Sequence, residues 1–132
     1  MYVCIDNSGW REIVFEYGNN QADRLVWRME RLAVGEVASC FRRFLDHAGK
    51  TLADVGGIMV VTGAGGFTAA RVAAVIANTL GLAKQIPVVA VPAPLDWAAG
   101  LAALKALPAT RRYALPVYSR PPRIGPTEAY VV

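Results

Sequence analysis

The strongest constraint on the fold is a glycine-dense segment, residues 63–71 (Gly-Ala-Gly-Gly-Phe-Thr-Ala-Ala-Arg). It follows an apolar run at 58–61 that is typical of a buried strand, and it leads into an alanine-rich stretch that is typical of a helix. Glycines at this place allow a tight turn that brings backbone amides together at the start of the helix. The segment therefore predicts a strand, a turn and a helix in direct succession, as in α/β proteins.

The hydrophobic pattern of the whole chain predicts five strands and three helices. Strands are expected near residues 2–5, 12–16, 25–29, 57–61 and 88–91, and helices near 34–48, 68–83 and 95–106. Short turns at 7–9 and 18–20 favour an antiparallel meander of the first three strands, and the later alternation favours parallel additions to the same sheet. The predicted order is βββαβαβα in one mixed sheet.

Charge and proline content divide the chain near residue 108. Residues 105–132 hold five basic residues and one acidic residue, whereas the rest of the chain holds nine of each. Five prolines between Pro108 and Pro126 disfavour regular structure. We expect an α/β domain over 1–108 and a basic, proline-rich tail over 109–132. The tail could meet RNA phosphates or an acidic partner, or fold back over the domain as a solvated strap.

Composition argues against a membrane protein and against a metal site. No apolar run is long enough to span a membrane, and the N-terminus lacks the pattern of a signal peptide. Cys4 and Cys40 have no paired spacing, so we expect them to be small core residues in a reducing compartment. The chain is therefore expected to be cytoplasmic. Its 55% apolar content is high for a soluble chain and predicts apolar surface that faces a partner.

The helix expected near 68–83 is apolar on two sides. One ridge holds Val72, Ile76 and Leu80. The other face holds only small residues: Ala70, Ala73, Ala74, Ala77 and Gly81. Because the sheet can cover only one side, we expect the small-residue face to pack on another helix, either in a partner or in the helix near 34–48 of the same chain.

Four segments, in the same order along the chain, resemble the TsaB family, also called YeaZ. Residues 2–9 resemble the family's first strand and turn, and residues 63–71 resemble its GPGSFTGLR segment. Residues 85–91 (Gln-Ile-Pro-Val-Val-Ala-Val) are similar to its IPVVGVSSL strand, and residues 114–122 to its PLYLRPP ending. The resemblance implies an actin-like/Hsp70-like ATPase (ribonuclease H-like) half-domain. Members normally carry a second lobe after the equivalent of Ala106, so this chain is expected to be a short form.

The resemblance also implies a function and a partner. It implies a non-catalytic accessory subunit that binds a TsaD-like protein and supports transfer of a threonylcarbamoyl group to an adenosine of tRNA, which the chain reaches through the complex. It further implies a homodimer and association through the first two predicted helices. The partner-binding residues expected on this basis are Val37, Phe41, Ala70, Arg71, Ala73, Ala74, Ala77 and Gly81.

Two turns contain candidate contacts for an anion or nucleotide. These residues are Asp6, Asn7, Ser8, Gly63, Gly65, Gly66 and Thr68. A purely structural role explains both turns without a ligand, because Asn and Gly suit tight turns and the glycine segment lacks the Lys and Ser/Thr of a Walker motif. In the family's fold class the nucleotide lies between two lobes. We therefore expect no cofactor on the isolated chain, and ATP or ADP only at an interface with the TsaD-like partner.

Independent catalysis is not expected from the residues present. The chain has no Ser/His/Asp set, and its one histidine, His47, falls on the polar side of a predicted helix. Two alternatives to the accessory subunit stay open. One is a repurposed homodimeric interaction module, and the other is a small nucleotide-binding or anion-binding enzyme that uses Asp6 and the glycine turn.

Overall fold

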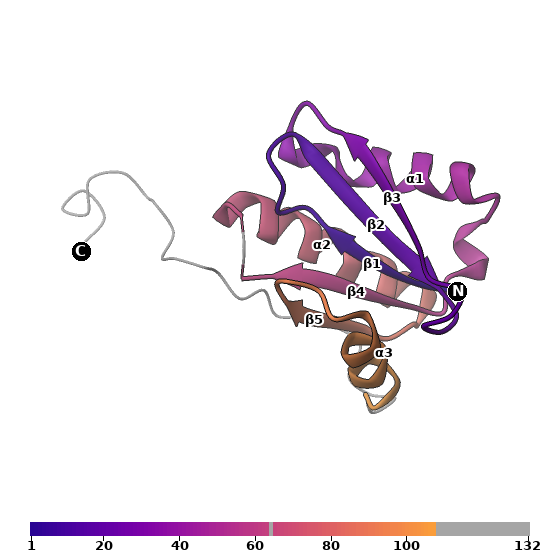
Figure 1. Ribbon diagram of the computed structural model, residues 1–132. Coiled ribbons are helices and arrows are strands. Elements are labelled where there is room, and N and C mark those ends of the chain that lie inside the picture. The colour runs from indigo at the N-terminus through magenta and orange to yellow at the C-terminus, as the bar shows by residue number, and fades with distance from the viewer. Residues whose placement is uncertain (64, 108–132) are drawn as a thin grey trace.

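Five strands form one mixed sheet in the order β3-β2-β1-β4-β5 (Figure 1). The computed structural model describes residues 1–63 and 65–107, so the predicted tail at 109–132 lies outside the described residues. The strands are β1 (Tyr2–Asp6), β2 (Glu12–Gly18), β3 (Leu25–Glu30), β4 (Gly57–Thr62) and β5 (Val88–Pro92). The pairs β1–β2 and β2–β3 are antiparallel, and β1–β4 and β4–β5 are parallel. The predicted meander with parallel additions is confirmed.

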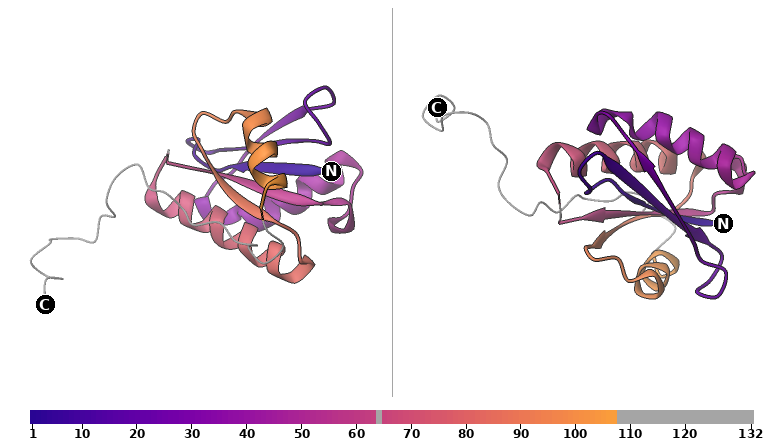
Figure 2. Two further views of the ribbon diagram at one scale, coloured as in Figure 1. Left: turned by 90° about the horizontal axis from the view of Figure 1, so that it is seen from below. Right: turned by 45° about the horizontal axis from the view of Figure 1, so that its top comes forward.

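Three α-helices cover the two faces of this sheet. They are α1 (Val37–Ala48), α2 (Phe67–Lys84) and α3 (Trp97–Lys105), and two 3-10 turns are η1 (Val34–Glu36) and η2 (Leu52–Asp54). Figure 2 shows α1 and α2 side by side on one face and α3 on the opposite face. The last helix begins two residues later than predicted because the Asp96 side chain caps it, accepting a hydrogen bond from the Ala99 amide at 3.1 Å.

An aromatic cluster forms the centre of the core between the sheet and α1. The ring of Phe44 is fully buried, stacks on Phe15 at 4.6 Å and meets the edge of Tyr17 at 4.9 Å. The buried residues of α1 recur at helical spacing and are Val37, Cys40, Phe41, Phe44 and Leu45. His47 is exposed, as expected, and its ring lies parallel to that of Trp27 at 4.1 Å, so it packs on the edge of β3.

The opposite face of the sheet has a smaller core under α3. Trp97, Leu101 and Leu104 of the helix pack on β1, β4 and β5, and the sheet residues of this cluster are Cys4, Met59, Val61 and Val91. Cys4 and Cys40 are both buried, as predicted, and burial raises the pKa of both thiols. The β2–β3 half of this face instead carries ion pairs between Arg24 and Glu16 and between Arg28 and Glu12.

Candidate functional site

The two candidate turns lie against each other at one edge of the sheet. β1 and β4 are parallel neighbours, so the turn that follows each strand emerges at the same edge. Gly65, at φ +73°, approaches so closely that a Cβ atom there would lie 2.8 Å from the Cα and the carbonyl oxygen of Ser8. The structure thus brings together candidate residues from segments almost 60 residues apart.

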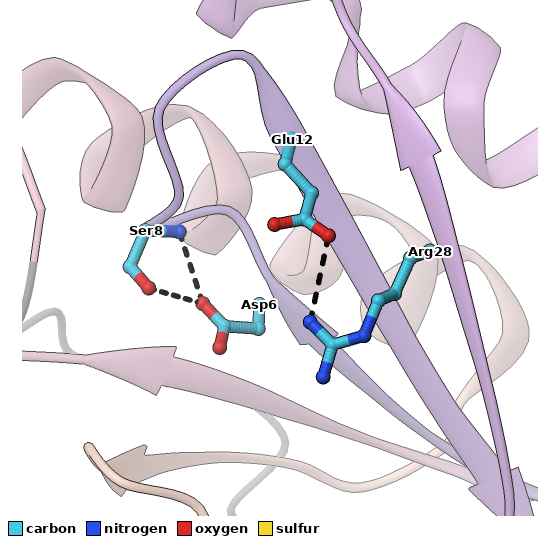
Figure 3. A network of polar contacts seen from close by, with 4 residues as sticks. All are labelled: Asp6, Ser8, Glu12 and Arg28. Carbon is cyan, nitrogen blue, oxygen red and sulfur yellow. Dashed lines mark hydrogen bonds and ion pairs between the residues drawn. The ribbon is translucent and has the colours of Figure 1, made fainter.

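The polar groups of the first turn are engaged within the chain. One carboxylate oxygen of Asp6 accepts hydrogen bonds from the Ser8 amide at 3.0 Å and from the Ser8 hydroxyl (Figure 3). The nearby side chains of Glu12 and Arg28, drawn in the same view, form an ion pair at 3.4 Å. The Asp6–Ser8 contacts are those of an Asx turn, which supports a structural role.

Asn7 is buried, and its side chain is hydrogen-bonded within the chain. Its amide nitrogen donates to the carbonyl oxygens of Ala69 at 3.1 Å and Val34 at 3.4 Å. Its side-chain oxygen accepts a hydrogen bond from Nε of Arg31. Because each polar atom of the Asn7 side chain has a partner inside the chain, the expectation that Asn7 contacts an anion is not met.

Arg31 is the site residue that the sequence analysis did not identify. Its side chain is 5% exposed, and its Nη2 donates to the carbonyl oxygens of Asn7 at 3.1 Å and Gly9 at 2.7 Å. Its backbone amide donates a hydrogen bond to the carbonyl oxygen of Arg11 at 3.0 Å. The alternation of β3 was the available signal, since Arg31 lies two residues beyond the buried Met29 and so continues the inward face.

The remaining candidate anion contacts are the exposed backbone of two glycines and the side chain of one threonine. Gly63, Gly66 and Thr68 are exposed. Gly66 is the residue that precedes α2. A hollow at the carboxyl ends of β4 and β5 is lined by Thr62, Gly63, Ala90, Val91, Pro92 and Ala93, none of which is charged. The contacts of Asp6, Asn7 and Gly65 within the chain fit a structural role for the two turns.

Gly65→Ala is expected to destabilise the fold by about 1–3 kcal/mol, because an alanine would be held at a left-handed φ and its Cβ would clash with Ser8. The measurement is the urea midpoint of the variant. Gly49→Ala is the matched control, since Gly49 also has a positive φ of +65° but open space around its Cβ position. Equal losses in the two variants would show that the contact with Ser8 adds nothing.

The small-residue face of α2 is covered by the chain itself. Ala70, Ala73, Ala74, Ala77 and Gly81 are all buried. Ala73 and Ala77 share one core cluster with Val37 and Phe41 of α1, which are also buried. The expectation that this face is left for a partner is not met, because the small side chains let α2 lie close to the sheet and to α1. Of the eight predicted partner residues, Arg71 alone is exposed.

A different face of α2 is open to solvent. Its exposed residues follow one another at helical spacing and are Thr68, Arg71, Val75, Thr79 and Leu82, called here the outer stripe. Val75 is 53% exposed and Leu82 is 78% exposed. Val75 and Leu82 are the large apolar side chains that the described part of α2 exposes, and Trp10, Leu25, Val26 and Leu32 are exposed elsewhere in the described residues.

The described residues contain neither a cluster of metal-binding side chains nor a membrane-spanning helix. Across residues 1–63 and 65–107, no group of three or more His, Cys, Asp or Glu side chains is placed to hold a metal ion. Within the same ranges, every helix is too short or too polar to cross a membrane.

Comparison with known proteins identifies one family model, and the similar solved structures include two related to YeaZ. The family model described as TsaD, tRNA N6-adenosine threonylcarbamoyltransferase, matches residues 30–103. YeaZ from Pseudomonas aeruginosa is 27% identical at a TM-score of 0.58, over 69% of this chain and 43% of that chain. A structure titled as an uncharacterised protein with similarity to the peptidase YEAZ from Pseudomonas aeruginosa has the same identity and TM-score, over 69% of this chain and 42% of its own. The chain thus spans less than half the length of these two structures, and no curated protein matches it.

Proposed function

Because the chain belongs to the TsaD family and is similar in sequence and fold to YeaZ, we propose that it takes part in threonylcarbamoyladenosine modification of tRNA. Its part in that modification is proposed to be that of a non-catalytic accessory subunit that binds a TsaD-like protein. The observation that carries the partner proposal is the outer stripe of α2, since the resemblance to the TsaB family implies association through the helix that follows the glycine turn.

The outer stripe replaces the small-residue face as the proposed contact surface. Val75 and Leu82 supply the apolar area, and Arg71, which was already among the predicted residues, supplies a charge at the N-terminal end. A few residues that become fully buried on binding carry most of the binding energy of a protein interface, and arginine is enriched among them. A second copy of the chain could occupy the same stripe, so a homodimer is proposed as the state in the absence of the partner.

The non-catalytic role is supported by how the candidate polar groups are used. Asn7 and Arg31 bind each other and nearby backbone, and Asp6 binds Ser8. A catalytic group must be within hydrogen-bond reach of a substrate proton, and these side chains have partners within the chain instead. Gly63, Gly66 and Thr68 remain the predicted contacts for ATP or ADP at an interface with the partner, and tRNA is proposed to be reached through that partner.

The proposal is tested by adding the purified chain to a TsaD-like subunit of the same organism, with tRNA and a threonylcarbamoyl donor. Mass spectrometry of the digested tRNA is expected to show more modified adenosine when the chain is present than when it is omitted. The chain alone is expected to modify nothing. Equal modification with and without the chain would contradict the accessory role, and modification by the chain alone would contradict the non-catalytic one.

A further inference from the structure

One buried pair of side chains, Asn7 and Arg31, joins parts of the molecule that are distant in sequence. Asn7 follows β1, and its side chain donates to Val34 in η1, just before α1, and to Ala69 in the first turns of α2. Arg31 follows β3 and binds the segment from Asn7 to Arg11 through its side chain and its backbone amide. The pair therefore connects the β1–β2 turn to the starts of both helices on one face of the sheet.

Burying the polar side chains of Asn7 and Arg31 costs free energy unless their hydrogen bonds are made. The guanidinium of Arg31 is bound by neutral oxygens of Asn7 and Gly9, and the ion pairs of the described residues do not include it. A buried cation without a carboxylate depends on such oxygens for its solvation. Loss of either side chain would leave the other with unpaired polar groups in the core, so the two act as a unit.

The β1–β2 turn that Arg31 binds contains an unusual backbone conformation and a highly exposed side chain. Arg11 lies at φ +55°, a left-handed conformation that is uncommon for residues other than glycine. The preceding residue, Trp10, is 91% exposed. The carbonyl of Ala69 that Asn7 holds is adjacent to Thr68, where the outer stripe of α2 begins. The pair thus contacts the turn and, through Asn7, the buried residue next to the first residue of the outer stripe.

We infer that Asn7 and Arg31 are a positioning pair that fixes the β1–β2 turn against the first turns of α1 and α2, so that the turn and the partner surface move as one body. Neither side chain reaches the solvent-facing stripe itself. Their effect on a partner is exerted through the position of α2. The effect on a partner rests on the proposed function, whereas the coupling of the turn to the helices does not.

Hydrogen exchange of the full-length Asn7→Asp variant, followed by mass spectrometry, tests the coupling in the chain alone. Aspartate keeps an oxygen for Arg31 but removes the donor to Val34 and Ala69 and places a charge against their carbonyls. Amides of residues 31–38 and 65–72 are expected to exchange about 10-fold faster, because two buried hydrogen bonds are lost. Those of β1, β4 and β5 are expected to stay unchanged. Arg28→Lys, in an exposed ion pair, is the control and is expected to alter neither region.

Two further results decide the inference. Arg31→Lys keeps the charge but lacks the separate Nε and Nη2 donors of the guanidinium, so it is expected to speed exchange at residues 7–11 and 65–72 as well. Unchanged exchange at 65–72 in both variants would overturn the inference, and so would a uniform increase over all strands, because that is the mark of a merely structural role. Binding of a TsaD-like subunit is expected to weaken about 10-fold in Asn7→Asp. Local exchange changes without that weakening would refute the effect of the pair on the partner and leave the coupling of the turn to the helices intact.

Discussion

Val75→Arg is expected to weaken binding of a TsaD-like subunit at least about 30-fold, equivalent to ~2 kcal/mol. Val75 is half exposed in the free chain, so an arginine there stays in solvent and leaves the urea midpoint nearly unchanged. In a complex the same arginine would be buried against the partner without a counter-charge, which opposes binding. Titration calorimetry with the purified partner measures the affinity.

The matched control for this substitution is Val26→Arg. Val26 is also a half-exposed valine, 45% open, but it lies on β3 and not on α2. Affinity in this variant is expected to equal that of the unaltered chain. The outer stripe would be refuted as the contact surface if Val75→Arg bound as tightly as Val26→Arg.

Ala74→Arg, one position earlier, is expected to destabilise the fold itself by at least about 3 kcal/mol, because it forces a long charged side chain into a packed core. Ala74 is 2% exposed and belongs to the face that α2 turns toward the sheet. The expected result is a large fall in the urea midpoint or a chain that does not fold. A normal midpoint together with lost association would restore the small-residue face as the partner surface.

The sheet and its helices could be predicted because their patterns are local. Strands showed runs of inward-facing apolar residues, and α1 showed one apolar and one polar face, so period and turn residues decided each element. The helix starts were less well predicted. The segment from 34 begins as the 3-10 turn η1 and becomes α1 only at Val37, and α3 starts where Asp96 caps it.

The orientation of α2 could not be predicted from its own residues. Both of its faces are apolar, so periodicity does not say which one meets the sheet. In the fold the alanines are buried and Val72, Ile76 and Leu80 are half-buried against the same core. Val75 and Leu82, which belong to neither predicted face, remain outside. The role of Arg31 was missed for a related reason: a charged residue is expected at the surface, and only its partners in the fold make burial tolerable.

The glycine turn illustrates why a sequence motif alone does not distinguish a binding role from a packing role. Glycines after a strand are needed both for phosphate binding and for close packing of two turns. Gly65 serves the second purpose, because its Cβ position is occupied by Ser8. The distinction depends on a neighbour almost 60 residues away, which no local pattern contains.

As an accessory subunit, the chain is proposed to dock on a TsaD-like protein through α2. The most direct measurement is the light-scattering mass after size exclusion, for the full chain alone and mixed with a TsaD-like subunit of the same organism. We predict a homodimer alone and a stable mixed complex after mixing, with the mixed complex lost in Val75→Arg. A chain that elutes with unchanged mass beside the TsaD-like subunit would contradict the claim.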